Sequence, residues 1–231
     1  MAHETLHLDG SPLTVEHVEA VARHGRRIAL ADSVHPRINA ARRAVEDVVR
    51  GTDAVYGINT GFGSLSRVRI PPADVRDLQR NLIRSHAAGV GEPLPRDVVR
   101  AMMLLLAASL SRGHSGVRLE VIERLLDMLN HDMTPVVPSR GSVGASGDLA
   151  PLAHAILALI GEGDVWYDGR RQSAAEAWQT IGTSPVELDA KEGLALINGT
   201  HLMAAQASLA LADARRVFDA AMCAAAMSID A

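Results

Sequence analysis

The chain has 231 residues, enough for one large domain or two small ones with a buried core. Hydrophobic residues make up 48% of it and aromatic residues only 3%, a composition that favours packed helices over sheets. The formal net charge is −4, with one lysine, Lys191, and scattered arginines, which argues against a nucleic-acid-binding protein.

Five helices are expected up to Asn130, from apolar side chains at helical spacing. Thr14 can cap the first helix, Gly51 ends the second and Pro72 marks the start of the third. The fourth has Pro95 in its first turn, and its sequence DVVRAMMLLLAASLSRG is apolar nearly all round, which predicts a buried helix. The apolar stripes of the other four are Val15, Val18, Val21 and Ala22; Ile38, Ala41, Val45 and Val48; Val75, Leu78 and Leu82; and Val121, Ile122, Leu125, Leu126 and Leu129.

The second half of the sequence predicts one hairpin and two further helices. VWYDGRRQ reads as two strands joined by an Asp168-Gly169 turn, and SAAE at 173–176 is a capping box for a short helix. From Thr200 to Ala231 runs a long alanine-rich helix that has no glycine, proline or basic last turn to stop it. We therefore expect this chain to be a truncated piece of a longer protein.

The cysteine content and the N-terminus indicate the compartment. Cys223 is the only cysteine, so an internal disulfide is impossible and a reduced, intracellular setting fits best. The opening MAHETLHLDGSPLT lacks the basic-then-apolar pattern of a signal peptide, and we find no apolar run of membrane-spanning length. A soluble cytoplasmic protein is expected.

One stretch matches a zinc-binding pattern. HETLH at 3–7 fits H-E-x-x-H, and Gly10 extends the match, but Leu13 occupies the third ligand position of the longer pattern. The stretch also lies at the end of the chain, where a rigid two-turn helix is not expected. We interpret it as a chance match and expect no metal site.

The stretch GSVGASGDLAPLAH, residues 141–154, places glycines and small residues in front of a helix-like run. Attack of the Gly147 nitrogen on the Ala145 carbonyl would close a five-membered ring, and loss of water from the ring and from Ser146 would leave an exposed methylene. Glycine tolerates the compressed backbone that this closure needs. The alternative is an ordinary turn in which Ser146 or Asp148 caps the next helix, with Pro151 in its first turn.

Four blocks in register resemble the histidine and aromatic amino acid ammonia-lyases: YGINTGFG, RSHAAGVG, GSVGASGDLAPLAH and GLALINGT. The resemblance extends over most of the chain. It implies a mainly α fold in which residues 1–193 form the N-terminal domain, with one small hairpin, and residues 194–231 begin a central helical bundle. Family members continue well beyond this point and assemble into tetramers through that bundle, so the resemblance also implies truncation and a homo-oligomer.

The same resemblance implies a built-in prosthetic group, 4-methylideneimidazol-5-one (MIO), formed from Ala145, Ser146 and Gly147 with help from Asp148, and no metal or diffusible cofactor. Such a group supplies the strong electrophile that ordinary side chains lack. In the family's usual account the substrate amine adds to it and a base removes the β-proton. Tyr56 matches that base. Its pKa, near ~10 when unperturbed, would have to be lowered by a positive environment such as nearby helix N-termini.

Two further matches have plain structural alternatives. Asn198 matches a residue that hydrogen-bonds near the MIO, but asparagine is also a good cap at a helix start. Tyr56 lies in a glycine-rich segment, whose Gly57, Gly61 and Gly63 permit a mobile lid, but its ring could equally pack under a loop. The resemblance places Gly63 and Leu149 among the substrate-binding residues.

Ser85 and His86 bear on substrate choice. They extend the stripe of the third helix, so we expect both on its inward face; the alternative is a satisfied histidine near a helix end before Gly89. A Ser-His pair resembles the histidine lyases, and an imidazole site would reject a phenyl ring by about 10⁴-fold. The expected reaction is elimination of ammonia from L-histidine to give trans-urocanate. Alternatives are a tyrosine or phenylalanine lyase, an aminomutase, or a non-catalytic fragment acting as an assembling scaffold.

Overall fold

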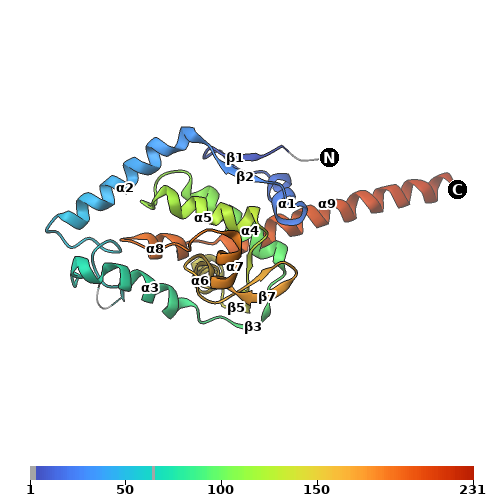
Figure 1. Ribbon diagram of the computed structural model, residues 1–231. Helices are drawn as coiled ribbons and strands as arrows, with labels where there is room; N and C mark the ends of the chain where they lie inside the picture. The colour runs from blue at the N-terminus through green and yellow to red at the C-terminus, as the bar shows by residue number, and fades with distance from the viewer. Residues whose placement is uncertain (1–3, 64–65) are drawn as a thin grey trace.

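The computed structural model describes residues 4–63 and 66–231, and its architecture is mainly helical (Figure 1), which confirms the expected fold class. The helices are α1 (Val15–His24), α2 (His35–Arg50), α3 (Val75–His86), α4 (Arg96–Leu110), α5 (Leu119–Asn130), α6 (Leu149–Leu159), α7 (Ala174–Ile181), α8 (Glu192–Ile197) and α9 (His201–Asp230). The strands are β1 (Leu6–Leu8), β2 (Ile28–Leu30), β3 (Val90–Pro93), β4 (Thr134–Pro135), β5 (Pro138–Arg140), β6 (Asp164–Tyr167) and β7 (Arg170–Ser173).

The expected starts of α1 and α7 and the expected end of α2 are confirmed by their caps, whereas Pro72 begins a short 3₁₀ turn and α3 itself starts at Val75. The Thr14 hydroxyl accepts a hydrogen bond from the backbone N–H of His17 at 3.2 Å, and Gly51 closes α2 through its N–H. Ser173 caps α7 by accepting from the N–H of Glu176. Pro95 occupies the N-cap of α4, one residue earlier than expected. The division at residues 193 and 194 stays a prediction.

The β structure is more extensive than the sequence indicates. The hairpin β6–β7 turns through Asp168 and Gly169, both at positive φ (50° and 72°), as expected of a two-residue turn. In addition, β4 pairs with β6, β1 pairs in parallel with β2, and β3 pairs with β5. Strands of two to four residues contain too few side chains for an alternating pattern to be detected.

The zinc-like stretch does not form the helix that a metal site of that type needs. His3 lies outside the described residues, while His7 lies in strand β1. Successive side chains of a strand point to opposite faces, so the spacing that would place two histidines on one helical face is lost here.

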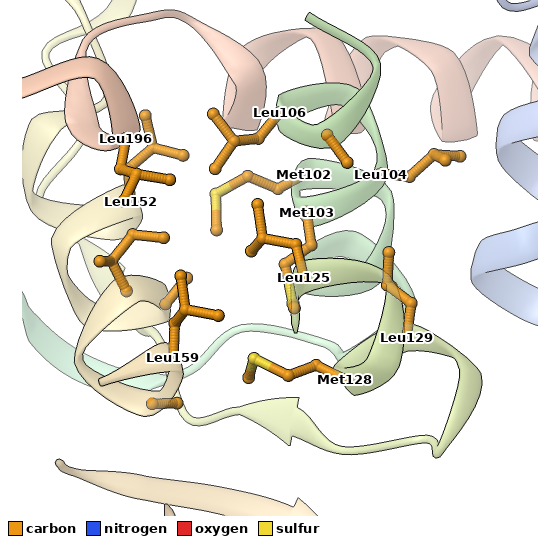
Figure 2. Close-up of a cluster of buried hydrophobic side chains, with 14 of the residues drawn as sticks. Met102, Met103, Leu104, Leu106, Leu125, Met128, Leu129, Leu152, Leu159 and Leu196 are labelled. Carbon is orange, nitrogen blue, oxygen red and sulfur yellow. The ribbon is translucent and has the colours of Figure 1, made fainter. Parts of the chain in front are cut away.

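The core is built from aliphatic and methionine side chains, as the composition predicts. Helix α4 lies at its centre and packs against α1, α5 and α9, while α6 packs against α3 and α8. Figure 2 shows α4 meeting α5 and α6 through a cluster of fully or almost fully buried side chains: Met102, Met103, Leu104, Leu106, Leu125, Met128, Leu129, Leu152, Leu159 and Leu196. One aromatic residue, Trp178, is also fully buried in this core. Its indole N–H donates to the Ala158 carbonyl at 2.8 Å.

Helix α9 begins in the core and then extends away from the rest of the molecule (Figure 1). Its buried residues all lie between Leu202 and Ala212, and every residue from Asp213 onward is exposed. Ion pairs join its middle to α1: Asp213 to Arg23, Arg215 to Glu16 and Arg216 to Glu19.

By length and composition alone, the helical stretch Glu192–Asp230 is apolar enough to span a membrane, so the expectation that no apolar run reaches that length is wrong. The core helix of a soluble protein can meet the same criterion. The first part of α9 packs on α1 and α4.

Candidate active site

The Ala145-Ser146-Gly147 segment forms a tight turn between β5 and α6. Residues Gly144–Ser146 make one 3₁₀ turn, in which the N–H of Gly147 donates to the Gly144 carbonyl at 3.0 Å. Gly147 has φ 125° and ψ 159°, a conformation that favours glycine, and a Cβ there would lie 2.8 Å from the Leu149 side chain. Ala145 and Ser146 are exposed. The turn therefore presents its serine to solvent on a backbone that only glycine accommodates at position 147.

Asp148 is fully buried, and its carboxylate joins this turn to α9. One oxygen accepts from the Ser142 hydroxyl at 2.5 Å, and the other accepts from the backbone N–H groups of Leu202 (2.7 Å) and Met203 (3.1 Å). The expected alternative, in which Asp148 caps α6, is wrong, because its side chain makes no capping bond to that helix. Asp148 instead supplies the negative charge at the N-terminus of α9.

Asn198 is exposed at the end of α8. It does not cap a helix start, so that alternative is also wrong. The next residue, Gly199, accepts a hydrogen bond from the backbone N–H of Asp148 at 2.8 Å, which holds Asn198 near the turn. A side chain at Gly199 would overlap the ring of His201. The turn and the LINGT block thus form one unit.

The inward face of α3 differs from the predicted one. Its buried residues are Val75, Gln79, Leu82 and Ile83, whereas Ser85 is exposed and His86 is half-buried. The prediction of an inward Ser85 is therefore wrong. The prediction took Leu78 as the middle of the buried face, but Leu78 is only partly buried and Gln79 is buried in its place. The buried face is therefore rotated around the helix axis, and Ser85 points outward.

His86 is oriented by its own helix. Its Nδ1 lies 2.9 Å from the Leu82 carbonyl oxygen, which can only accept, so Nδ1 is the donor of this contact; in the neutral ring, Nε2 is then left as an acceptor. The Ser85 hydroxyl also donates to the Leu82 carbonyl, at 2.9 Å, and lies 3.2 Å from Nδ1 of His86. The pair forms a local cluster that fixes the imidazole tautomer.

A glycine–histidine contact joins the segment after His86 to α6, the helix that follows the turn. The backbone N–H of Gly89 donates to Nε2 of His154 on α6 at 3.0 Å. A Cβ at Gly141, which opens the block containing the turn, would lie 3.3 Å from the Gly89 Cα, so the two backbones are in close contact. His154 was not among the predicted site residues, although it ends the block that carries the turn.

Tyr56 lies on the loop after α2 with 57% of its surface exposed, so it is not packed beneath that loop. Its ring meets Phe62 edge-to-face, with centroids 6.1 Å apart. Gly57, at φ 76°, passes so close to Leu194 of α8 that a Cβ would lie 2.5 Å from that side chain. Gly63 also has positive φ, 57°. The loop therefore packs against α8, the helix that leads to Asn198, at Gly57.

The structure brings together only part of the predicted site. The turn, Asp148, Leu149 and the Asn198 segment are in direct contact, and the His86 segment joins them through Gly89. Within residues 4–63 and 66–231, no hydrogen bond connects Tyr56, Ser85 or His86 to the turn itself.

The sequence profile of the aromatic amino acid lyases matches residues 13–231. The chain belongs to this family. Histidine ammonia-lyases from Deinococcus radiodurans and Symbiobacterium thermophilum are each 54% identical to it, over 95% and 96% of this chain and 42% and 44% of their own lengths. This aromatic amino acid lyase chain thus spans less than half the length of the curated relatives it matches.

Solved structures of the family share its fold. The histidine ammonia-lyase from Trypanosoma cruzi superposes with a TM-score of 0.86 at 40% identity, covering 93% of this chain and 42% of that one. The phenylalanine aminomutase from Pantoea agglomerans gives 0.87 at 35% identity, over 94% and 42%. Lyases and aminomutases therefore have the same arrangement of these helices.

Burial of two histidines predicts how the stability of this lyase chain depends on pH. Desolvation lowers the pKa of His154 and of His201 below the ordinary 6.5. As pH falls below 6.5, the unfolded chain takes up protons that the folded chain does not, so the free energy of unfolding should fall until the folded pKa values are reached. Urea unfolding on either side of pH 6.5 measures this. Replacing both residues by glutamine should flatten the dependence, and an unchanged slope would contradict it.

Proposed function

We propose that this chain is the MIO-forming part of a histidine ammonia-lyase, which eliminates ammonia from L-histidine without oxidation to give trans-urocanate. The observation that carries the proposal is the Ala145–Gly147 turn, with its glycine-only backbone and its buried Asp148 anchor, in a chain 54% identical to proteins named for that reaction. The activity proposed is that of the longer protein, because the relatives are more than twice as long as the part matched here.

The residues of the turn fit the MIO group. Ala145 and Ser146 are small and exposed, Gly147 already has a backbone that excludes a side chain, and Asp148 fixes one end of the turn. Once formed, the group would supply the electrophile that activates the substrate amine as a leaving group. No metal or diffusible cofactor is part of the proposal.

His86 is the proposed selector of the substrate ring. With Nδ1–H committed to Leu82, its Nε2 can accept a hydrogen bond from an N–H of the substrate imidazole. A phenyl ring has no such donor and would leave the acceptor unpaired. A tyrosine hydroxyl could also donate, so tyrosine chemistry is the second candidate, and a tyrosine aminomutase structure is 38% identical to this chain. The 54% identity to histidine lyases favours histidine.

Tyr56 is the proposed base for the β-proton. Its hydroxyl lies on an exposed, glycine-containing loop, which can move toward a substrate held at the turn. Asn198 is proposed to hydrogen-bond beside the turn, and Gly63 and Leu149 to border the substrate. These roles are proposed from the resemblance together with the placement of these residues. A cytoplasmic location is proposed from the single cysteine.

The test compares histidine, tyrosine and phenylalanine as substrates of the full-length protein, with urocanate absorbance and ammonia as the readouts. Histidine turnover that disappears both in Ser146→Ala and after borohydride treatment would support the proposal. A preference for phenylalanine would rule out the histidine assignment. No turnover, with an intact mass that shows no loss of water, would instead indicate a non-catalytic scaffold.

The exposed end of α9 predicts self-association, in keeping with the proposed homo-oligomer. Val217, Phe218, Met222, Met227 and Ile229 are each more than half exposed on this helix, and an apolar surface of this kind normally marks an interface. Analytical ultracentrifugation of the 231-residue chain should show species larger than the monomer. Phe218→Glu should shift the distribution toward monomer, while the matched control Gln206→Glu, on the same helix, should leave it unchanged. A clean monomer at high concentration would contradict the prediction.

A further inference from the structure

We propose that Ser142 is a positioning residue for the ring closure of the Ala145–Gly147 turn. The inference rests on the proposed MIO function and assigns a role to a side chain outside the reacting triad. It starts from two hydrogen bonds: the Ser142 hydroxyl donates to the Asp148 carboxylate at 2.5 Å, and its oxygen accepts from the backbone N–H of Gly144 at 3.1 Å.

These bonds place Ser142 between a fixed anchor and the start of the turn. Asp148 is fully buried and is held by the N–H groups of Leu202 and Met203 on α9. The hydroxyl has one proton, and the carboxylate can only accept, so that proton is directed at Asp148 and the lone pairs remain for Gly144. Ser142 thereby connects the Gly144 backbone to a buried carboxylate that is hydrogen-bonded to the start of α9.

The balance of the reaction shows why the Gly144 end matters. The Gly147 nitrogen bonds to the Ala145 carbonyl carbon, and the first water leaves with that carbonyl oxygen and the amide hydrogens of Gly147 and Ser146. The second water carries the Ser146 hydroxyl and its α-hydrogen, leaving the methylene. No oxidant or reductant is needed.

Both amide hydrogens that leave are held by the segment that Ser142 fixes. The N–H of Ser146 donates to the Val143 carbonyl at 3.3 Å, and the N–H of Gly147 donates to the Gly144 carbonyl at 3.0 Å. Val143 and Gly144 directly follow Ser142 in the chain. Without the Ser142 hydroxyl this segment loses its bond to Asp148, and we expect the turn to visit the compressed geometry less often.

The test is the intact mass of the full-length protein over time after synthesis. Ser142→Ala is expected to lose its two waters about ten-fold more slowly than the unchanged protein, the effect of removing one hydrogen bond to a charged group. Ser142→Thr keeps the hydroxyl and should cyclise normally. Ser139→Ala, an exposed serine three residues earlier, is the matched control and should also cyclise normally.

The outcomes separate this inference from the proposed function. Equal rates in Ser142→Ala and the unchanged protein would overturn the role of Ser142 alone. Slow loss in both Ser142→Ala and Ser142→Thr would also overturn it, because the hydroxyl would not be the cause. An unchanged protein that never becomes two waters lighter would overturn the proposed function, and this inference with it. Circular dichroism on each variant verifies that the helices are intact.

Discussion

Replacing Glu192 with glutamine is expected to lower the free energy of unfolding by about 3–5 kcal/mol, the cost of breaking a buried ion pair by neutralising one partner. Glu192 is fully buried at the start of α8. The substitution preserves its size but removes its charge, so the guanidinium groups of Arg118 and Arg42 would lose their buried counter-ion.

The contacts of Glu192 explain the size of this effect. One carboxylate oxygen accepts from the backbone N–H of Arg118 (3.0 Å) and from its Nε (2.9 Å). The other accepts from the same guanidinium at 2.8 Å and from the backbone N–H of Asp189 at 2.8 Å. Arg42 of α2 approaches to 3.6 Å. The hydrogen bonds that the Arg118 guanidinium donates to Glu192 raise the pKa of Arg118 above its ordinary value. A single side chain thus ties α2, the start of α5 and the start of α8 together.

Chemical denaturation measures the loss, and Glu187→Gln is the matched control. Glu187 pairs with Arg76 at 3.3 Å, but both side chains are mostly exposed, so removing this charge should cost less than about 1 kcal/mol. Equal, small losses for the two variants would show that the buried cluster does not hold α8 in place.

The helical part of the fold was predictable because its signal is local and repeated. Each predicted helix carries several apolar residues at helical spacing, and the all-round apolar run after Pro95 becomes α4, the centre of the core. A cap such as Thr14 bonds to a backbone N–H only three residues further along the chain, so it can be recognised from a short stretch of sequence. Asp168 and Gly169 are recognisable for the same reason.

The contacts that assemble the site were not predictable from one sequence. The Asp148 carboxylate caps a helix 54 residues further along the chain, and His154 accepts from Gly89, 65 residues away. Neither contact has a spacing rule that sequence reading can use. The four motif blocks indicate which segments form the site, but the direction of each side chain depends on packing. Ser85 is predicted on the wrong face of α3 because Gln79, a polar residue, is buried on that helix.

The second large effect is expected at Asp148, where alanine should lower the free energy of unfolding by about 3 kcal/mol. The substitution leaves the N–H groups of Leu202 and Met203 without their acceptor, and a buried group left unpaired costs about 1–3 kcal/mol. It also removes the negative charge at the N-terminus of a 30-residue helix, worth up to about 1 kcal/mol more.

Amide hydrogen exchange locates this loss. Exchange at Leu202 and Met203 should become faster in Asp148→Ala, while Thr14→Ala, which removes an exposed cap worth about 1 kcal/mol, should leave those two amides protected. Unchanged protection in Asp148→Ala would mean that packing alone holds α9. The same carboxylate also accepts a hydrogen bond from the Ser142 hydroxyl, so the start of α9 and the Ala145–Gly147 turn are held by one side chain. Removing that side chain should therefore loosen the turn together with the helix.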